Sequence, residues 1–465
     1  MAPDRPHNAL LIPDLRELLR DGETETVREF LDEFHPARIA EVVEDLGAPD
    51  GDEVINLLNP RNRAEALSYL PADEQVRLVE GMGPELAAEL LHHMPHDERA
   101  DLVTRLEEDC IDAIMPRLAH AEREDIRRLA AYEPGTAGAA MTTDYAVLPP
   151  HLNVRDALER LRHEAPDRET IYYSYIVDAE RRLIGLVSLK NLILARPRSR
   201  IEEIMASEIV RANVDEDQES VARKIEDYDL IAIPVVDADD KLVGIVTHDD
   251  AMDILRREQT TDMLQFGGVT ADAEADDETY WRGRIVDSVR RRLLWLLLLF
   301  FGGGITGLVI RSFNWVDNRF PDIEFDAFIP LLIGTGGNAG SQTVGTVIRG
   351  LALGEITPGD APRVLLREVL TGGLLGTLLG AIGFLFTWLL LGQPPAFALV
   401  ISLAILGICV WANGVGGMVP IFARWVGIDP AVISAPLIST LVDTTGLIIF
   451  YSIAIIVLMR LFNPN

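Results

Sequence analysis

Five long apolar runs in the second part of the chain constrain its fold more than any other feature. Each has about the length of the 20 or so apolar residues that an α-helix needs to cross a bilayer. They cover residues 293–312, 327–348, 364–391, 397–420 and 432–459. The sequence therefore predicts a membrane domain of five transmembrane helices over residues 286–465.

One carboxylate interrupts the last run. Asp443 is the only acidic residue between Val432 and Arg460, and hydroxyl side chains flank it within one helical turn. An ionised carboxylate at the centre of a membrane helix costs about 2.5–3.5 kcal/mol on the insertion scale. Two interpretations are open: Asp443 is tied to a neighbouring helix, or it meets a cation on a pathway through the membrane. We favour the second.

The second run is unusually polar for a membrane helix. Residues 334–342 read GTGGNAGSQ. Backbone of this composition is tolerated in a membrane where protein covers it or where it lines a water-filled cavity, and small residues also allow close helix packing. Asn338 and Gln342 are four residues apart and share a helix face, which favours a polar lining.

Charge divides the chain into two parts. Residues 1–280 hold 63 Asp and Glu against 30 Lys and Arg, whereas residues 281–465 hold 10 against 12. The acidity of the first part argues against nucleic acid or anionic lipid as its partner and allows cations. The chain starts without a signal-peptide pattern, so we expect the first part to be cytoplasmic. In this orientation nine Arg lie at the cytoplasmic ends of the spans and three at the outer ends, as the positive-inside rule requires. Five spans then leave the C-terminus outside.

A twelve-residue repeat occupies residues 59–106. It reads NPRNRAEALSYL, PADEQVRLVEGM, GPELAAELLHHM and PHDERADLVTRL. Each copy has a Pro at its first or second position and ends on Leu or Met, which is typical of short helices stacked as a solenoid. We expect an all-α solenoid over residues 1–132.

A second repeat predicts a pair of α/β modules. IVDAERRLIGLVSLKNL matches VVDADDKLVGIVTHDDA at an offset of 59, and the segments upstream match at an offset of 64. Ser188–Asn191 and Thr247–Asp250 carry the pattern of a helix start. Each copy resembles a CBS module, and we expect the two modules over residues 139–199 and 203–256.

The order of these parts resembles the MgtE family of magnesium channels, as do GTGGNAGSQ and GIDPAVISAPLISTLVDTTG at 427–446. The resemblance implies a homodimer in a prokaryotic cell membrane that passes Mg²⁺, with no enzymatic activity. It also implies a linking helix over 257–285 that plugs the pore, and a pore lined by the second and fifth spans. The expected pore residues are Gly337, Asn338, Ser439 and Asp443.

The resemblance also implies a cytosolic Mg²⁺ sensor that closes the pore. Its acidic ligands fall on Glu65, Asp97, Asp101, Asp217, Glu219, Asp229, Asp250, Asp253 and Glu258. Taken singly, such acidic residues are more often solvated surface than metal ligands, but their joint match to the family pattern favours ligands. ATP is a ligand of some relatives. Here Leu230 and Asn191 replace an expected aromatic and an expected acid, which argues against ATP, although Tyr173 remains.

Four other functions were weighed. An intramembrane protease needs a membrane histidine or a second membrane aspartate, and no histidine follows His248. A secondary transporter needs inverted repeats, which five unequal spans do not show. A non-conducting sensor leaves Asp443 and the polar second span unexplained. A CBS-regulated carrier of Mn²⁺ or Co²⁺, or one coupled to protons or sodium, stays open as the alternative to a channel.

Overall fold

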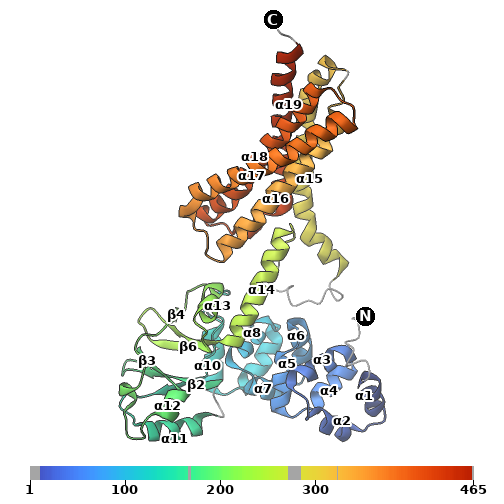
Figure 1. Cartoon of the computed structure of the whole chain (residues 1–465). Helices are drawn as coiled ribbons and strands as arrows, with labels where there is room; N and C mark the ends of the chain where they lie inside the picture. Colours follow the sequence, from blue (N-terminus) through green and yellow to red (C-terminus); the bar gives the residue numbers. More distant parts are fainter. Residues whose placement is uncertain (1–10, 166–168, 271–283, 322, 463–465) are drawn as a thin grey trace. The chain divides into compact units, whose positions relative to one another are not determined.

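The computed structural model describes residues 11–165, 169–270, 284–321 and 323–462 (Figure 1). These residues form two compact units. The N-terminal unit extends to Glu258, and the C-terminal unit contains the described residues from Gln259 onward. The boundary lies within one helix, so each unit is described by itself.

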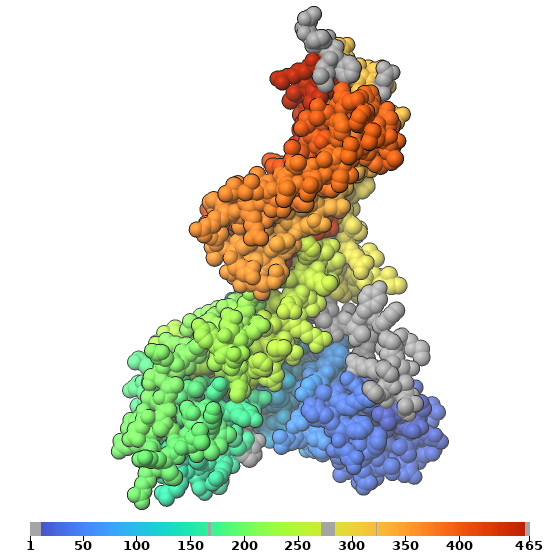
Figure 2. Space-filling model, in the orientation of Figure 1, coloured from blue at the N-terminus to red at the C-terminus, as the bar shows by residue number. Residues whose placement is uncertain are grey.

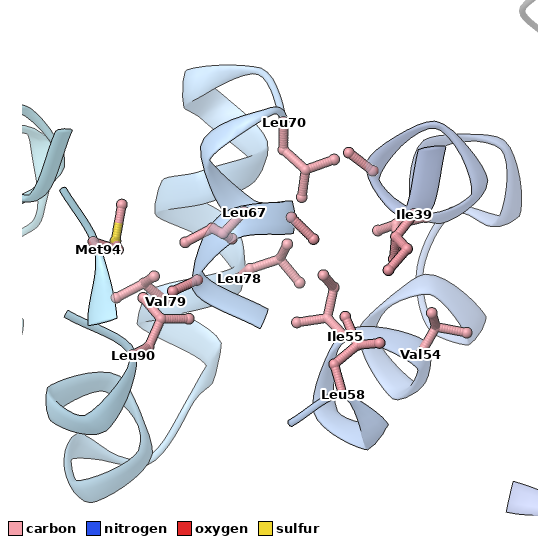
Figure 3. Packing of buried hydrophobic residues seen from close by; sticks show 14 of the residues in the cluster. Ile39, Val54, Ile55, Leu58, Leu67, Leu70, Leu78, Val79, Leu90 and Met94 are labelled. Atoms are coloured by element: carbon pink, nitrogen blue, oxygen red, sulfur yellow. The ribbon is translucent and has the colours of Figure 1, made fainter. Parts of the chain in front are cut away.

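The N-terminal unit begins with short helices that stack as a solenoid, as the sequence predicts. In the described residues these helices are α1 Leu11–Arg20, α2 Thr24–Leu31, α3 Pro36–Leu46, α4 Asp50–Leu57, α5 Pro60–Ser68, α6 Ala72–Gly81, α7 Pro84–His93, α8 His96–Arg105, α9 Glu108–Ile114 and α10 His120–Leu129. From α5 onward the helices pack mainly on their second neighbours along the chain, such as α5 on α7 and α8 on α10, whereas α1 packs mainly on α2 and α4 on α3. The apolar side chains labelled in Figure 3 come from successive helices and point toward one another.

The twelve-residue spacing of helix starts continues beyond the repeat that is visible in the sequence. Helices α5 to α8 start at residues 60, 72, 84 and 96, and α9 and α10 continue the spacing at 108 and 120. Proline is favoured at the first helical position because its missing N–H has no partner there in any case, and it occupies that position in α5 and α7. The Asn59 side chain accepts a hydrogen bond of 2.8 Å from the amide of Asn62 and caps α5.

Two three-stranded modules follow the solenoid. The first consists of β1 Tyr145–Leu148, α11 Val154–Glu164, β2 Thr170–Val177, β3 Leu183–Ser188 and α12 Leu189–Leu194. The second consists of β4 Ala212–Asn213, α13 Gln218–Asp227, β5 Ala232–Val236, β6 Leu242–Thr247 and α14 His248–Phe266. In each sheet the middle strand pairs in parallel with the first strand and antiparallel with the third. This repeated order confirms the predicted pair of CBS modules.

The two modules bind each other through equivalent residues. The Leu183 amide donates to the Asp240 carbonyl, and the Leu242 amide donates to the Arg181 carbonyl, both at 3.1 Å. Arg181 and Asp240 are 59 residues apart, the offset of the sequence repeat, and both have left-handed backbones with φ of 66° and 63°. The solenoid joins this pair through a shared apolar core that includes Ala100 and Leu129. Figure 2 shows the solenoid, in blue, and the modules, in green, in contact.

The helix after the second module is shorter than expected. The sequence predicts a linking helix over 257–285, but α14 starts at His248 and ends at Phe266. Gly267 and Gly268 end it, and Gly268 has φ of 73°, a conformation that only glycine adopts freely. The prediction of a helix is therefore wrong for residues 267–270, which follow the end of α14. Its remainder at 271–283 lies outside the described residues.

Five long helices build the C-terminal unit: α15 Ile285–Arg319, α16 Ile329–Ala352, α17 Ala361–Leu385, α18 Pro395–Val426 and α19 Ala435–Phe462. Within the described part of the chain, four segments are long and apolar enough to cross a membrane: 285–319, 358–390, 395–426 and 435–460. The polar helix α16 is not among them. Its glycines and amide side chains lower its hydropathy, so the structure supports four of the five predicted spans on this criterion.

Glycines let two helices of this unit approach each other closely. A Cβ atom built on Gly372, Gly376 or Gly380 of α17 would lie 2.6–2.8 Å from backbone atoms of α18. The four-residue spacing places these glycines on one face of α17. Small residues of this kind allow helix backbones to pack where lipid offers no hydrophobic driving force. Helix α17 is thereby held against α18, and α16 and α19 also pack on α18.

Candidate functional site

Helices α16 and α19 meet where the sequence predicts the ion site. A Cβ atom built on Gly337 would lie 3.4 Å from Asp443 Oδ1 and would overlap Ser439 Oγ. The absence of a side chain at Gly337 therefore brings the α16 backbone against the carboxylate. The structure places three of the four expected residues together, while Asn338, the next residue on α16, is exposed.

The Asp443 carboxylate has no protein partner among the described residues. The flanking hydroxyls of Thr440 and Thr444 donate to carbonyls of their own helix at 3.0 and 3.3 Å. Thr444 also contacts Thr306 of α15 at 2.7 Å. These contacts leave the carboxylate oxygens available, which disfavours the interpretation that Asp443 is tied to a neighbouring helix.

A second carboxylate of this unit escaped the sequence analysis. Glu368 lies on α17 within the predicted third span, and a Cβ atom built on Gly417 of α18 would lie 3.1 Å from its Cγ. The Thr343 hydroxyl donates to Asn413 Oδ1 of α18 at 2.7 Å. The signal was an acidic residue inside an apolar run, the same signal that singled out Asp443.

In the N-terminal unit, carboxylates from three segments of the chain gather at one place. They are Asp97 and Glu98 of α8, Glu169 before β2, and Asp250 of α14. Burial and the charges of Asp250, Glu98 and Glu169 raise the pKa of Asp97 well above its ordinary value. Asp97 Oδ1 is buried without a hydrogen-bond partner. The group is costly to ionise in the absence of a cation.

Two members of this cluster were not predicted from the sequence. Burial, opposed by a hydrogen bond from Ser68, raises the pKa of Glu98 to about 7. Loss of water and the charges of Asp250 and Asp249 raise the pKa of Glu169 to about 7, although this residue is exposed. Glu169 lies far from Asp97 in sequence, so only the fold reveals it.

Near Tyr69 the solenoid and α14 bring acidic residues together at a second place. Burial raises its pKa, as do the charges of Glu98, Asp249, Glu65 and Asp253. Glu65 and Asp253, both expected sensor residues, therefore lie near the same ring. Glu65 is also paired with Arg61 at 2.9 Å. Asp101 lies one turn after Asp97 on α8 and is exposed.

The remaining expected sensor residues lie around α13. Asp217 caps this helix by accepting a bond of 3.0 Å from the Ser220 amide, and Glu219 is paired with Arg223. Gln218 donates to Glu258 of α14 at 3.0 Å, which brings the two helices together. Asp229 follows α13 with φ of 50°. These acids form a group separate from that around Asp97.

No described group of three or more His, Cys, Asp or Glu side chains is close enough to hold a metal ion directly. Mg²⁺ gives up its waters reluctantly and is usually held by one or two carboxylates and several waters. Any Mg²⁺ held between these acids would therefore be bound partly through water.

A cavity of about 490 Å³ lies between the solenoid and the first module. His96 of α8 contacts Asp125 of α10 at 2.9 Å and Asp144, just before β1, at 3.1 Å. Burial opposes the ionisation of Asp125, but contacts with His96, Thr143 and Arg128 more than offset it and lower its pKa to about 2. These contacts fix the solenoid beside the first module.

The two candidate ATP residues lie near each other on the first module. Tyr173 of β2 pairs with Ser188 of β3, and Ser188 caps α12 by accepting a bond of 3.1 Å from the Asn191 amide. Asn191 is exposed. The predicted helix start at Ser188–Asn191 is thus confirmed. At the start of α14 the direction is reversed, because the Thr247 amide and hydroxyl donate to the Asp250 carboxylate.

Comparison with known proteins agrees with each part. A family model for divalent cation transporters, MgtE, matches residues 329–453. Models for the MgtE intracellular N domain and the CBS domain match residues 34–135, and 137–198 and 201–257. The chain is 40% identical to the magnesium transporter MgtE of Thermus thermophilus over 71% of each chain. It is 35% identical to that of Enterococcus faecalis over 71% of this chain and 70% of the relative.

Solved structures resemble the N-terminal unit. One is the cytosolic domain of the Mg²⁺ channel MgtE in complex with ATP, at a TM-score of 0.51 and 38% identity, over 52% of this chain and 99% of that one. Another is the soluble part of a magnesium transporter, at a TM-score of 0.51 and 33% identity, over 54% and 99%. On the strength of these matches, the chain belongs to the MgtE family, a family of transporters rather than enzymes.

Proposed function

We propose that this protein is a Mg²⁺-selective channel that takes up magnesium across a prokaryotic cell membrane. The observation that carries the proposal is the meeting of α16 and α19, where Gly337 exposes backbone beside the unpartnered Asp443 carboxylate. Mg²⁺ keeps most of its waters, so a single carboxylate beside polar backbone can hold the ion through them. Magnesium transport by the relatives supports the choice of ion.

The channel is a homodimer with five spans in each chain. One carboxylate cannot balance a divalent charge, so two copies of Asp443 around a two-fold axis complete the site. Helix α16 is the second of these spans; it packs on α18 and α19 and lines the pathway together with α19. This arrangement places the solenoid and the CBS modules, with the boundaries given above, in the cytoplasm and the C-terminus outside.

Cytosolic Mg²⁺ closes the channel. The cluster of Asp97, Glu98, Glu169 and Asp250 joins the solenoid to the CBS modules while its like charges repel. Mg²⁺ bound through water between these carboxylates relieves the repulsion and draws the parts together. The same holds for the acids around Tyr69 and α13. Helix α14 starts in this unit and transmits the change toward the pore.

Replacing Asp443 tests the proposal. Asp443→Ala in lipid vesicles should reduce Mg²⁺ uptake at least about 100-fold while the protein still assembles as a dimer, because it removes the carboxylate of the pore. Asp443→Asn keeps the shape and should lose the preference for divalent over monovalent ions. Wild-type uptake in Asp443→Ala would refute the pore site.

The alternative function is a carrier of Mn²⁺ or Co²⁺, or a carrier coupled to protons or sodium. It predicts a different result in electrical recordings. Single-channel recording with Mg²⁺ on one side should show discrete openings for a channel. A carrier gives saturable flux without openings, and a coupled carrier needs a proton or sodium gradient.

A further inference from the structure

The cavity between the solenoid and the first module has no role in the transport proposed above. Its volume of about 490 Å³ lies within the range of small-molecule sites, about 300–1,000 Å³. Helices α8 and α10 line it from the solenoid, and β1, α11 and the turn between β2 and β3 line it from the module. The candidate ATP residues Tyr173 and Asn191 are not among its lining residues, so the cavity is separate from that site.

Arg99 of α8 brings a buried positive charge to the cavity wall. Its side chain is 2% exposed. Nη2 donates to Asp125 Oδ2 at 3.3 Å and Nη1 to the Leu91 carbonyl at 3.4 Å, both longer than the roughly 2.7–2.9 Å of a good charge-assisted bond. Nε is buried and has no hydrogen-bond partner in the described structure. Because a buried charge needs close acceptors, Arg99 is short of negative charge.

Asp125 cannot supply the missing charge, because other groups already share it. Thr143 Oγ1 donates to Asp125 Oδ1 at 3.0 Å, Arg128 Nη2 donates to the same oxygen at 2.7 Å, and His96 Nδ1 lies 2.9 Å from Oδ2. An ionised carboxylate offers about four lone-pair positions, and these contacts together with Arg99 use them.

The other carboxylates of the lining are also engaged. Each has an amide or a cationic side chain as its partner: Glu122 the Ala119 amide at 2.7 Å, Asp144 the His96 ring at 3.1 Å, and Glu164 the Arg160 guanidinium at 2.8 Å.

Arg181 brings a second cation to the cavity from the module side. It lies in the turn between β2 and β3, is exposed, and donates through Nη2 to the Tyr145 hydroxyl at 3.2 Å. That hydroxyl in turn donates to the Leu242 carbonyl at 3.1 Å, so the acceptor of Arg181 is neutral. In the described part of the chain, no carboxylate pairs with Arg181.

We propose that the cavity binds a small molecule that carries one phosphate group, held by Arg99 and Arg181. The planar guanidinium group matches the spacing of phosphate oxygens and donates to them in pairs. The volume exceeds that of a phosphate, which leaves room for an organic part. The remaining carboxylates of the lining repel further negative charge, so the ligand is a phosphate monoester rather than a nucleoside triphosphate.

Such a ligand joins the solenoid to the first module, because Arg99 and Arg181 lie on opposite sides of the cavity. Helix α8 also carries Asp97 of the carboxylate cluster, two residues before Arg99. A ligand that holds α8 against the module therefore favours the arrangement in which Mg²⁺ bridges that cluster. It lowers the Mg²⁺ concentration that this arrangement needs. This consequence rests on the proposed Mg²⁺ gate, whereas the binding site does not.

Isothermal titration calorimetry of the full-length protein in Mg²⁺-free buffer tests the site. Ribose 5-phosphate should bind saturably at one site in each chain, inorganic phosphate should bind more weakly, and ribose should not bind. Arg181→Gln should weaken the binding of ribose 5-phosphate at least about tenfold, because it removes a charged donor. Arg181 is exposed, so this variant leaves the core unchanged.

Arg182→Gln is the matched control, since Arg182 is the next residue, is exposed and does not line the cavity. It should bind ribose 5-phosphate as the wild type does. The absence of saturable binding for both phosphate compounds, or equal affinity in wild type and Arg181→Gln, would overturn the proposal.

Protease resistance of the full-length protein against MgCl₂ concentration tests the coupling. Saturating ribose 5-phosphate should move the midpoint to several-fold lower Mg²⁺ in the wild type and not in Arg181→Gln. The variant also corrects for Mg²⁺ that the probe itself binds. A wild-type midpoint that does not move although calorimetry shows binding contradicts the coupling. A wild type without any Mg²⁺ response contradicts the gate and leaves the calorimetric result as the decision on the site.

Discussion

The two units treat their carboxylates in opposite ways. The N-terminal unit brings Asp97, Glu98, Glu169 and Asp250 together from three segments, and their pKa values rise because burial and like charge both oppose ionisation. The C-terminal unit keeps Asp443 and Glu368 on different helices, each against a glycine. A group of neighbouring carboxylates responds gradually to any cation that reduces their mutual repulsion. A membrane site with a single carboxylate depends entirely on that one residue. The first arrangement suits a sensor and the second suits an ion pathway.

After the loss of Asp443 itself, the largest effect should come from filling the space beside its carboxylate. Gly337→Ala places a methyl group where Ser439 Oγ lies and should reduce Mg²⁺ uptake at least about tenfold. Gly334→Ala is the matched control on the same helix, because nothing lies within 4 Å of a Cβ there, and it should transport normally. Adding Ser439→Ala to Gly337→Ala should restore part of the uptake. Equal loss in both single variants would mean that helix flexibility, not space, is at stake.

The next effect concerns the crowded cluster. In a fragment of residues 1–280, Asp97→Asn removes a buried, unpartnered carboxylate oxygen. It should make the metal-free fragment more stable and move its Mg²⁺-dependent compaction to several-fold higher Mg²⁺. Protease resistance against MgCl₂ concentration measures both. Asp109→Asn, on the exposed face of α9, should change neither.

A salt control separates bridging from screening in that experiment. The Debye length is about 8 Å at 0.15 M, so KCl also weakens repulsion between carboxylates. If KCl of equal ionic strength compacts the wild-type fragment as well as MgCl₂ does, the cluster is solvated surface and the proposed gate loses its basis.

A smaller effect should appear in the pH dependence of stability. The pKa values of Glu98 and Glu169 are raised from 4.5 to about 7. The folded state therefore keeps protons that the unfolded state releases between about pH 4.5 and 7, and the free energy of unfolding falls as pH rises through that window. The lowered pKa of Asp125, about 2, acts in the opposite sense below about pH 4. Thermal unfolding of the metal-free fragment should follow this course, and saturating Mg²⁺ should flatten the fall between pH 4.5 and 7.

The smallest effect lies away from both groups of carboxylates. Asn59→Ala removes the cap of α5 and should lower the free energy of unfolding by about 1 kcal/mol. It should leave the Mg²⁺ midpoint of the fragment unchanged, whereas Asn59→Ser should keep most of the stability. A shifted midpoint in Asn59→Ala would show that solenoid stability, and not the cluster alone, sets the response.

Most of the architecture could be predicted because it depends on local sequence patterns. Proline positions set the starts of α5 and α7, the offset of 59 reappears in Arg181 and Asp240, and apolar length marks the spans. The period was missed at α9 and α10, where Glu107 and Ala119 replace the prolines that announce the earlier helices. The end of α14 was missed because a pair of glycines stops a helix whose polar pattern alone does not end there.

The sites were harder to predict because they depend on contacts between distant segments. Asp443 was found from its unfavourable setting within one helix, but Glu169 has an ordinary local sequence and becomes notable only beside Asp250. Glu368 could have been found by the test applied to Asp443. The hydrogen bond between Thr343 and Asn413 could not, since these residues come from two different helices.

The stacking of the solenoid also determines how it comes apart. Because each helix rests on its near neighbours, its stability is close to a sum of local terms, and opening can spread from a free end one helix at a time. The end at α1 and α2 lies far along the stack from α8, which holds Asp97 and shares a core with the CBS modules. Amide hydrogen exchange should therefore be fastest in α1 and fall toward α8. The solenoid can lose its outer turns to a protease and still present Asp97 to the CBS modules.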